Sequence, residues 1–297
     1  MTQQMKADGM LVLVTLFWGI SYLLMDISLE AMGPFTLNAY RFLGAFFIAA
    51  ICAFPKVRTV NRITLKYSAL LGFILLFVYI GATFGVLYTS LSNAGFLCAL
   101  TVVLTPLFGF LFLRQKTSKK LALVVAMAFT GIALLTLTES LKPRVGDLLC
   151  IMCAAAYAID LLMTERVVKK EGVNVFQVGV FQLGFTGTFM LFMSFFFERP
   201  VLPNSSKVWI SVLILSIFCT GMAFIVQVIA QQYTSAAHVG VIFALEPVFA
   251  GIVAYFFAGE ILSPRAYLGA FLLVSSLFVM EIDFKKLFAK KKELEEV

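Results

Sequence analysis

The stretch SAAHVGVIFALEPVFAGIVAYFFAGEILS, residues 235–263, guides the interpretation of the whole sequence. It is apolar enough to lie within a lipid bilayer, yet it contains the only histidine of the chain, His238, and a carboxylate, Glu246. Pro247 follows directly, removes a backbone donor and frees the carbonyl group of Phe243 one turn earlier. A carboxylate at membrane depth is unfavourable unless it finds a partner, water or a proton. The stretch therefore indicates a membrane protein in which the position of this acidic residue needs an explanation.

The composition of the whole chain agrees with a membrane environment. Of its 297 residues, 61% are hydrophobic and only 13% are charged, and no long polar region indicates a separate soluble domain. The net charge of +7 would suit nucleic acid, but Lys and Arg lie in short loops and in the tail, as membrane topology requires. We therefore expect membrane lipid around the protein and no nucleic-acid partner. The first apolar run lacks a small-residue cleavage pattern, so we expect it to remain as a span.

Ten apolar segments approach the length of about 20 residues that crosses a bilayer as a helix. Polar breaks at residues 55–66 and 198–207 are their clearest boundaries, and the break around Ser90–Asn93 is the weakest. The sequence thus predicts an all-α membrane protein of ten transmembrane helices. The segments are 9–28, 35–54, 67–88, 93–113, 120–137, 147–164, 175–197, 208–230, 237–257 and 264–282.

The distribution of basic residues predicts the orientation of these segments. With the N-terminus in the cytoplasm, the inner segments hold seventeen Lys and Arg residues and the outer loops hold five. Because inner loops carry the excess of positive charge, both termini are expected to be cytoplasmic and the protein to lie in the plasma membrane. The Lys-rich tail, residues 285–297, either keeps the C-terminus inside or also binds anionic lipid.

The fourth and ninth segments resemble each other. CALTVVLTPLFGF (98–110) and VGVIFALEPVFAG (239–251) both carry a proline in mid-span, Pro106 and Pro247. Each proline is expected to kink its helix. The proline is common to the two copies, whereas the preceding residue, Thr or Glu, is not.

The first and sixth segments also align. LFWGISYLLMDI (16–27) matches AAYAIDLLMTER (155–166), which pairs Trp18 with Tyr157 and places Asp160 opposite a serine. Segments one to five therefore correspond to segments six to ten. An odd number of spans in each copy inserts the second copy upside down, and such inverted repeats are typical of alternating-access carriers.

These features together resemble the drug/metabolite transporter superfamily, and more closely its ten-span EamA-type branch. The resemblance rests on the order and spacing of several weak motifs over nearly the whole chain, and it implies a bundle with a central cavity and export or exchange of small metabolites such as amino acids. It divides the chain into a first five-helix repeat (1–140), a second (141–284) and the charged tail. The first repeat departs from the pattern in carrying Gln115 where the second carries Glu260. The motifs are Trp18–Gly19, Arg41 in YRF, Pro106, Pro247 and Glu260.

Three titratable groups are candidates for substrate or proton binding. Glu246 binds a cationic group, carries a proton, or only braces a kink. Asp160 either faces the cavity or pairs with Arg166 or another basic residue near the inner surface. His238, eight residues before Glu246, lies close to the inner end, where an interfacial hydrogen bond competes with a role in proton transfer.

Rings with a polar tip and one buried amide complete the predicted binding site. Such rings suit amphipathic or cationic ligands, and Trp18 and Tyr22 share a helix face because they are four residues apart. Arg41, at depth in the second segment, is expected either in a structural ion pair with Asp26, Glu30 or Glu246, or in contact with an anionic group. The predicted substrate-binding residues are Trp18, Tyr22, Tyr79, Tyr157, Asp160, Gln227 and Glu246.

The sequence therefore predicts a secondary transporter of small metabolites, an exporter in the leading interpretation, driven by a gradient and coupled to protons if a carboxylate carries one. No P-loop, nucleophile–base pair or histidine cluster indicates an enzyme, a cofactor or a metal site; Cys150 and Cys153 form an isolated CxxC. A membrane scaffold or sensor without transport, or an exchanger of nucleotide sugars or phosphorylated metabolites, is the alternative.

Overall fold

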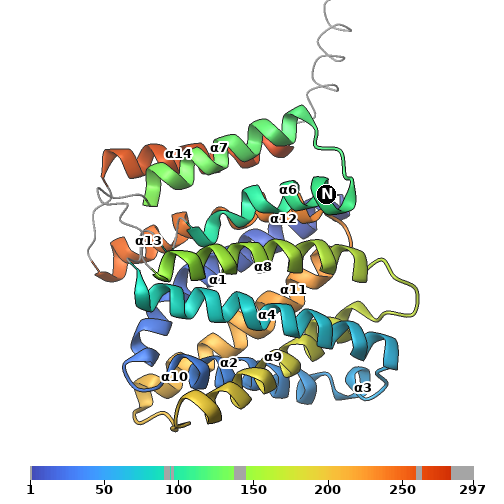
Figure 1. Cartoon of the computed structure of the whole chain (residues 1–297), viewed down its shortest axis with the longest axis vertical. Coiled ribbons are helices and arrows are strands. Elements are labelled where there is room, and N and C mark those ends of the chain that lie inside the picture. Colours follow the sequence, from blue (N-terminus) through green and yellow to red (C-terminus); the bar gives the residue numbers. More distant parts are fainter. Residues whose placement is uncertain (1, 90–93, 95–96, 137–144, 259–262, 282–297) are drawn as a thin grey trace, which may run out of the picture.

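The computed structural model describes residues 2–89, 94, 97–136, 145–258 and 263–281 (Figure 1). Every secondary-structure element in this part of the chain is a helix. The tail 285–297, the connection around Ser90–Asn93 and Glu260 lie outside the described residues. The helices are α1 (Gln3–Leu29), α2 (Pro34–Cys52), α3 (Phe54–Val57), α4 (Arg62–Tyr88), α6 (Thr101–Leu113), α7 (Lys119–Thr136), α8 (Val145–Val167), α9 (Val175–Phe197), α10 (Ser206–Ile214), the π-helix η1 (Leu215–Met222), α11 (Ala223–Ala230), α12 (Ala236–Phe243), α13 (Glu246–Ala258) and α14 (Pro264–Glu281).

The described helices have the lengths and compositions of membrane spans. Seven are long and apolar enough to cross a bilayer, and two shorter apolar helices cover Leu97–Leu113 and Pro264–Met280. The predicted segment 175–197 coincides with α9 at both ends. Asn61, Asn174, Ser205 and Ser235 each accept a hydrogen bond from the first turn of the helix that follows, which explains why helices begin at those polar residues. The prediction of an all-helical membrane protein is confirmed.

Two of the long apolar rods are irregular. α10, η1 and α11 form one rod whose middle eight residues, Leu215–Met222, are π-helical. The rod of α12 and α13 is interrupted at Ala244 and Leu245, between Phe243 and Glu246. Pro247 therefore occupies the second residue of α13, where a missing backbone donor does little harm. Pro106, in contrast, lies inside α6, and the helical turn before α6 is interrupted at Leu100.

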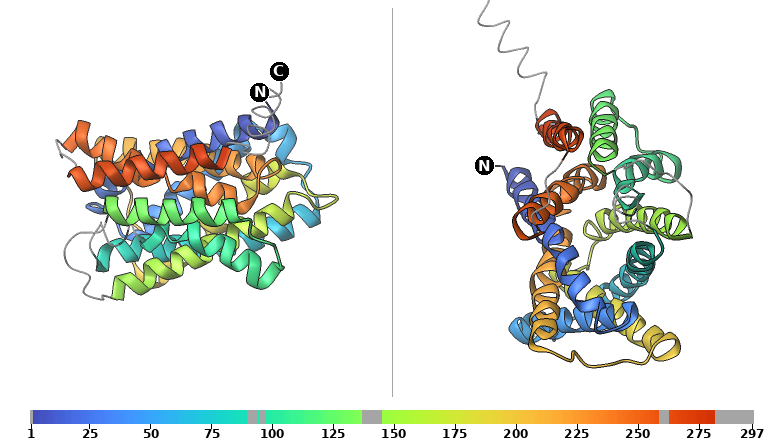
Figure 2. Two further views of the ribbon diagram at one scale, coloured as in Figure 1. Left: turned by 90° about the horizontal axis from the view of Figure 1, so that it is seen from above. Right: turned by 90° about the vertical axis from the view of Figure 1, so that its left-hand side faces the viewer.

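Close helix packing depends on small residues, because lipid offers no hydrophobic force between helices. A side chain on Gly81 would lie 2.6 Å from the carbonyl oxygen of Leu149, so α4 and α8 approach backbone to backbone. A side chain on Gly187 would lie 2.7 Å from the backbone nitrogen of Leu43, where α9 meets α2. α7 and α14 pack along each other at one edge of the bundle, as Figures 1 and 2 show.

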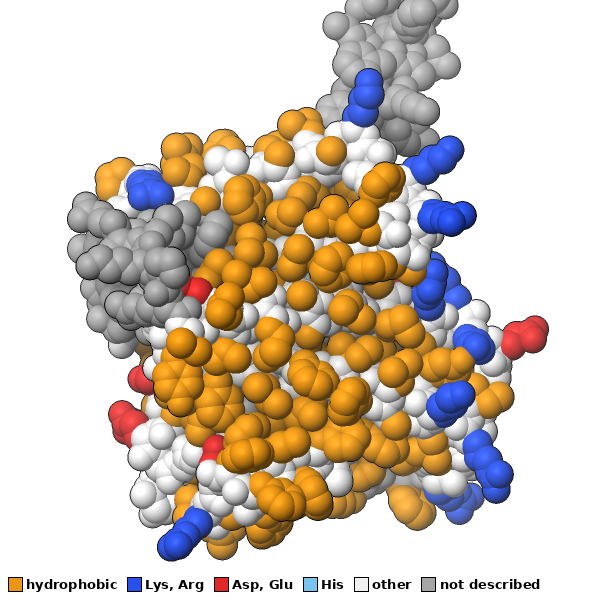
Figure 3. Space-filling model, in the orientation of Figure 1, with side chains coloured by type: hydrophobic (Ala, Val, Ile, Leu, Met, Phe, Trp, Pro, Cys, Tyr) orange, Lys and Arg blue, Asp and Glu red, His pale blue; other side chains and the backbone are white. Residues whose placement is uncertain are grey.

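The surface divides into an apolar face and a basic edge. In the view of Figure 3, hydrophobic side chains cover most of the face, and Lys and Arg side chains line one edge. Exposed phenylalanines such as Phe112, Phe256 and Phe257 belong to an apolar surface that is larger than soluble proteins leave uncovered. The distribution matches a protein surrounded by lipid with its basic loops at one membrane surface.

Candidate functional site

Tyr22 and Glu246 join α1 to the second half of the chain. The Tyr22 hydroxyl donates a hydrogen bond of 2.7 Å to Glu246 Oε1. Glu246 begins α13, so its carboxylate also lies at the positive end of a helix dipole. Both side chains are partly accessible. The interruption before α13 thus places a carboxylate at the first turn of a helix and next to a phenol.

Six aromatic rings from both halves gather beside this pair. The Trp18 ring lies 4.7 Å from the Phe243 ring in an edge-to-face arrangement and 6.0 Å from the Tyr157 ring, measured between centroids. Tyr157 and Phe243 stack at 6.0 Å. Phe224 links this group to the remaining rings, and we call the whole set the aromatic cluster. It consists of Trp18, Phe42, Tyr79, Tyr157, Phe224 and Phe243.

The π-helix supplies polar partners to the cluster. Trp18 Nε1 donates to the carbonyl oxygen of Cys219 at 3.0 Å. The next residue, Thr220, accepts a hydrogen bond of 2.8 Å from Arg41 Nε. π-helical turns are rare and frequent at functional sites. Here the turn presents adjacent residues of η1 to two different helices, α1 and α2.

Arg41 is buried against aromatic rings. Its guanidinium carbon lies 5.0 Å from the centroid of the Tyr79 ring, and its Nη1 donates to the Met25 sulfur at 3.4 Å. The sequence predicts an ion pair with Asp26, Glu30 or Glu246, but within the described residues no carboxylate lies within 4.0 Å of this guanidinium. The structure therefore replaces the expected ion pair by a hydroxyl and cation–π contacts. A contact with an anionic group stays a prediction.

Asp160 lies in a polar chain that crosses between helices α8 and α11. Its carboxyl interacts with the Gln227 side chain, and the Tyr157 hydroxyl donates to Gln227 Oε1 at 2.9 Å. Gln227 Nε2 donates to Gln231 Oε1 at 3.4 Å, and Gln231 Nε2 donates to the Leu161 carbonyl oxygen at 2.9 Å. Asp160 is only 1% exposed, and its Oδ1 has no hydrogen-bond partner among the described residues. The expected alternative, an ion pair with Arg166 or another basic residue, is not found in that part of the chain.

His238 meets a carboxylate that the sequence pattern does not single out. His238 Nε2 lies 3.4 Å from Asp8 Oδ1, and both residues are largely buried. Asp8 directly precedes the first predicted segment, 9–28. In the structure, α1 begins at Gln3, five residues before Asp8, so Asp8 belongs to this helix and is buried in the bundle. The clue in the sequence is Asp8 itself, an acidic residue directly before an apolar run. His238 thus lies in a helix–helix contact away from Glu246.

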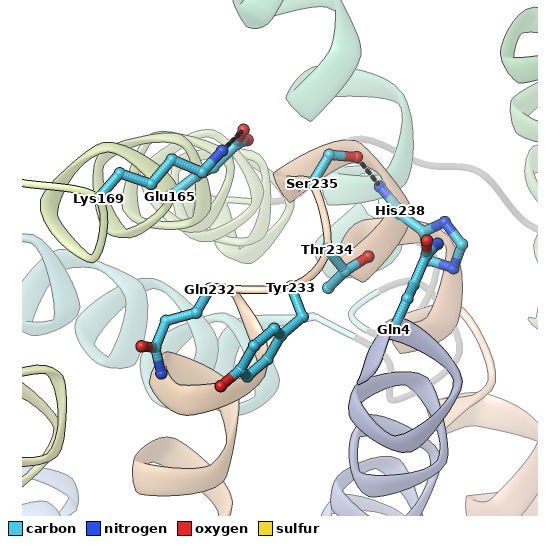
Figure 4. Close-up of a pocket in the computed structure, with 8 residues that line it drawn as sticks. All are labelled: Gln4, Glu165, Lys169, Gln232, Tyr233, Thr234, Ser235 and His238. Atoms are coloured by element: carbon cyan, nitrogen blue, oxygen red, sulfur yellow. Dashed lines mark hydrogen bonds and ion pairs between the residues drawn. The ribbon is translucent and has the colours of Figure 1, made fainter. Parts of the chain in front are cut away.

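A polar pocket of about 370 Å³ opens beside His238 (Figure 4). Figure 4 shows side chains from α1, from α8 and the turn after it, from α12 and from the loop between α11 and α12 around it. Glu165 bridges two of these elements: Oε1 pairs with Lys169 at 2.9 Å, and Oε2 accepts a hydrogen bond of 2.9 Å from the backbone nitrogen of Ala236. The pocket is lined by Gln4, Glu165, Lys169, Gln232, Tyr233, Thr234, Ser235 and His238.

The structure therefore divides the predicted residues into groups. Trp18, Tyr79 and Tyr157 belong to the aromatic cluster. Tyr22 lies one turn beyond Trp18 on α1, and its hydroxyl binds Glu246 of α13. Asp160 and Gln227 form the polar chain, and His238 lies apart at the pocket. The described residues contain no group of three metal-ligating side chains, and the cysteines in them form no disulfide.

Comparison with known proteins gives one family. The profile of the EamA-like transporter family matches residues 5–137 and again residues 144–282. A protein of Archaeoglobus fulgidus described as an uncharacterized transporter is 28% identical over 94% of this chain and 87% of its own length. A similarly described protein of Methanothermobacter thermautotrophicus is 26% identical, over 91% of this chain and 84% of its own. A solved crystal structure shares the fold with a TM-score of 0.80, covering 95% of this chain and 98% of the other at 18% identity.

Proposed function

Because the chain belongs to the EamA-like transporter family, we propose that it is a secondary active carrier that exports small metabolites, such as amino acids or amines, across the plasma membrane by alternating access. The family and the transporter-named relatives make it a membrane transporter rather than an enzyme.

We infer ten spans in two inverted repeats, 1–140 and 141–284, with both termini and the tail 285–297 in the cytoplasm. The helix contacts support this topology, because the main packing pairs have counterparts under exchange of the halves. α2 packs on α9, α6 on α12 and α7 on α14, which are the pairs of corresponding helices. Exchange of the halves also relates α4 to the α10–η1–α11 rod and α8 to α1. Accordingly, α4 packs on α8, and the rod packs on α1.

The contact between Trp18 and Tyr157 is the observation that carries the proposal. The two residues align in the repeats, and their rings meet at 6.0 Å in the middle of the aromatic cluster. A residue that touches its own counterpart lies on a two-fold axis. In inverted-repeat carriers the substrate binds near such an axis, at the interface of the repeats. The cluster is therefore the proposed substrate site.

The groups around the cluster suit a ligand with a cationic part. Glu246 is bound by Tyr22, one turn from Trp18, and Gln227, which interacts with Asp160, accepts a hydrogen bond from the Tyr157 hydroxyl. A carboxylate and the faces of Trp and Tyr rings are the groups that recognise ammonium ions. We assign Glu246 and Asp160 to the cationic group of the substrate or to a coupling proton.

Transport by purified protein in liposomes tests the proposal. Radiolabelled amino acids and amines are loaded one at a time, and counterflow is measured with and without a pH gradient. We expect saturable counterflow for at least one amine-bearing compound, accelerated by a gradient of the appropriate sign. Absence of flux for the whole panel, with protein shown to be folded by its thermal transition, would contradict the proposal. Flux confined to phosphorylated compounds would contradict the substrate class alone.

A further inference from the structure

α12 is a short helix that joins α13 through a two-residue turn at one end and contacts side chains of α8 and α1 at the other. The interruption at Ala244 and Leu245 separates it from α13, and Pro247 cannot donate a backbone hydrogen bond across that junction. Its last residue, Phe243, packs on Trp18 in the aromatic cluster. α12 therefore reaches from the proposed substrate site to the pocket of Figure 4, and along its length it packs on α1, α6 and α8.

Two contacts fasten the start of α12 to other helices. Glu165 of α8 accepts a hydrogen bond of 2.9 Å from the backbone nitrogen of Ala236, the first residue of α12, where the helix dipole favours a negative charge. Asp8 of α1 lies 3.4 Å from His238, two residues later. Ser235 caps the same turn from within the loop. The Glu165 contact is the one that bridges α8 and the very end of α12.

The start of α12 borders the pocket and is connected to the polar chain by the α11–α12 loop. Glu165, Lys169 and Thr234 line the pocket. The fully buried Gln231, which belongs to the polar chain with Gln227 and Asp160, directly precedes the residues of the α11–α12 loop that form the pocket wall. Moving the start of α12 away from α8 would connect the pocket to that chain.

The closed arrangement leaves two hydroxyl groups without partners. Thr164 Oγ1, beside Glu165, and Thr234 Oγ1, beside Ser235, are buried and have no hydrogen-bond partner among the described residues. Buried unsatisfied hydroxyls are unfavourable and uncommon in native proteins. Both would be hydrated if α12 separated from α8. The boundary between α8 and α12 thus combines one charged contact with two buried hydroxyls that lack partners. These features suit a helix that alternates between two packed positions.

We propose that Glu165 is a positioning residue that holds the pocket end of the transport route closed by binding the N-terminus of α12, and that α12 turns about Ala244–Leu245 when this contact breaks. This inference rests on the proposed alternating-access function. Lys169 only shares the carboxylate: it is exposed, and its pair with Glu165 is of the surface kind that contributes little. The oxygen that holds α12 is Oε2.

Cysteine accessibility tests this role without knowledge of the substrate. Thr234→Cys is made in a Cys52→Ser background, since Cys52 is the exposed native cysteine of the described residues, and labelling by a membrane-impermeant maleimide is followed in inside-out vesicles. We expect Glu165→Gln to raise the labelling rate of Thr234→Cys by about fivefold or more, the lower end of ordinary two-state coupling. Lys169→Met and the exposed Glu171→Gln should leave the rate unchanged.

A second reporter separates an opened route from a loosened fold. Thr186→Cys, deep in α9 and fully buried, should stay protected in Glu165→Gln. An unchanged labelling rate of the Thr234→Cys reporter in Glu165→Gln, an equal rise at both reporters, or an equal rise in Lys169→Met would each overturn the role of Glu165. Because labelling needs no substrate, these outcomes stand apart from the transport assay: a selective rise without measurable flux would contradict the proposed function and leave the closure by Glu165 in place.

Discussion

The hydroxyl of Tyr22 lies 2.7 Å from Glu246 Oε1, so residues 224 positions apart in the chain share one hydrogen bond between α1 and α13. Glu246 begins α13, and Tyr22 lies one turn beyond Trp18 on α1. The contact links Glu246, the carboxylate that distinguishes the ninth predicted segment from the fourth, to a residue one helical turn from Trp18 of the aromatic cluster. It connects α1 with the interrupted rod of α12 and α13. We expect these two elements to move most when access alternates between the two membrane sides.

Removing this hydroxyl should weaken transport without damage to the fold. We expect Tyr22→Phe to lower kcat/KM in proteoliposomes by about tenfold, because a hydrogen bond to a charged group contributes about 1.5–3 kcal/mol and part of it is replaced by water. Tyr255→Phe is the matched control, since Tyr255 lies on the exposed surface of α13. Equal kinetics in the two variants would show that the Tyr22 contact does not take part in transport.

Neutralising Glu246 separates proton coupling from ligand binding. In Glu246→Gln we expect the acceleration by a pH gradient to disappear while counterflow persists at a lower rate, because the amide keeps hydrogen bonding but cannot exchange a proton. The exposed Glu30→Gln serves as a control for loss of one negative charge. Complete loss of counterflow would instead assign Glu246 to the cationic group of the substrate, and gradient-driven uptake at the original rate would exclude both roles.

Replacing Arg41 by Lys should destabilise the protein although the charge is kept. The planar guanidinium donates to Thr220 and lies over Tyr79, and an ammonium group cannot reproduce both contacts. Cation–π contacts contribute about 0.5–2 kcal/mol, so we expect the thermal transition in detergent to fall by about 2–6 °C. Arg62→Lys, at the exposed start of α4, should leave the transition unchanged. An equal transition in both variants would contradict the packing described for Arg41.

A methyl group on Gly81 should push α4 away from α8. It would lie 2.6 Å from the carbonyl oxygen of Leu149 and 2.8 Å from Cys153 Cβ, and overpacking of this kind costs about 1–3 kcal/mol. We expect Gly81→Ala to lower the thermal transition. Gly9→Ala, where nothing lies within 4 Å, should leave it unchanged or raise it, because alanine favours a helix more than glycine does. The reverse order of the two variants would contradict the close approach of α4 and α8.

Some contacts that organise the fold leave little trace in the sequence. Glu198 ends α9 in a polar break and accepts hydrogen bonds of 2.8 Å from the backbone nitrogens of Phe35 and Thr36 at the start of α2. Glu165 does the same for α12. In the sequence, each has the appearance of an ordinary loop or helix-end charge. Only the approach of a second helix end, remote in the chain, gives it a capping role.

The irregular helices are predictable in part. Pro247 indicates a disturbed helix, and the rod is interrupted, but just before the proline, at Ala244 and Leu245. Nothing in LSIFCTGM, residues 215–222, predicts a π-helix. A proline acts through its own missing donor, which local sequence reveals. A π-turn depends on packing and on partners such as Trp18 and Arg41, which come from other helices.

The sequence by itself establishes that the protein lies in a lipid bilayer, that it is helical and that its halves resemble each other. Hydropathy and helix length depend on consecutive residues, and a repeat is found by comparing two such segments. The meeting of polar groups is a property of the packed bundle: Tyr22 with Glu246, Arg41 with Thr220, Asp8 with His238 and Glu165 with Ala236. These pairings depend on the rotation and axial shift of each helix against its neighbours. Close contacts at small residues such as Gly81 and Gly187 fix both, and a pattern within one helix does not contain them.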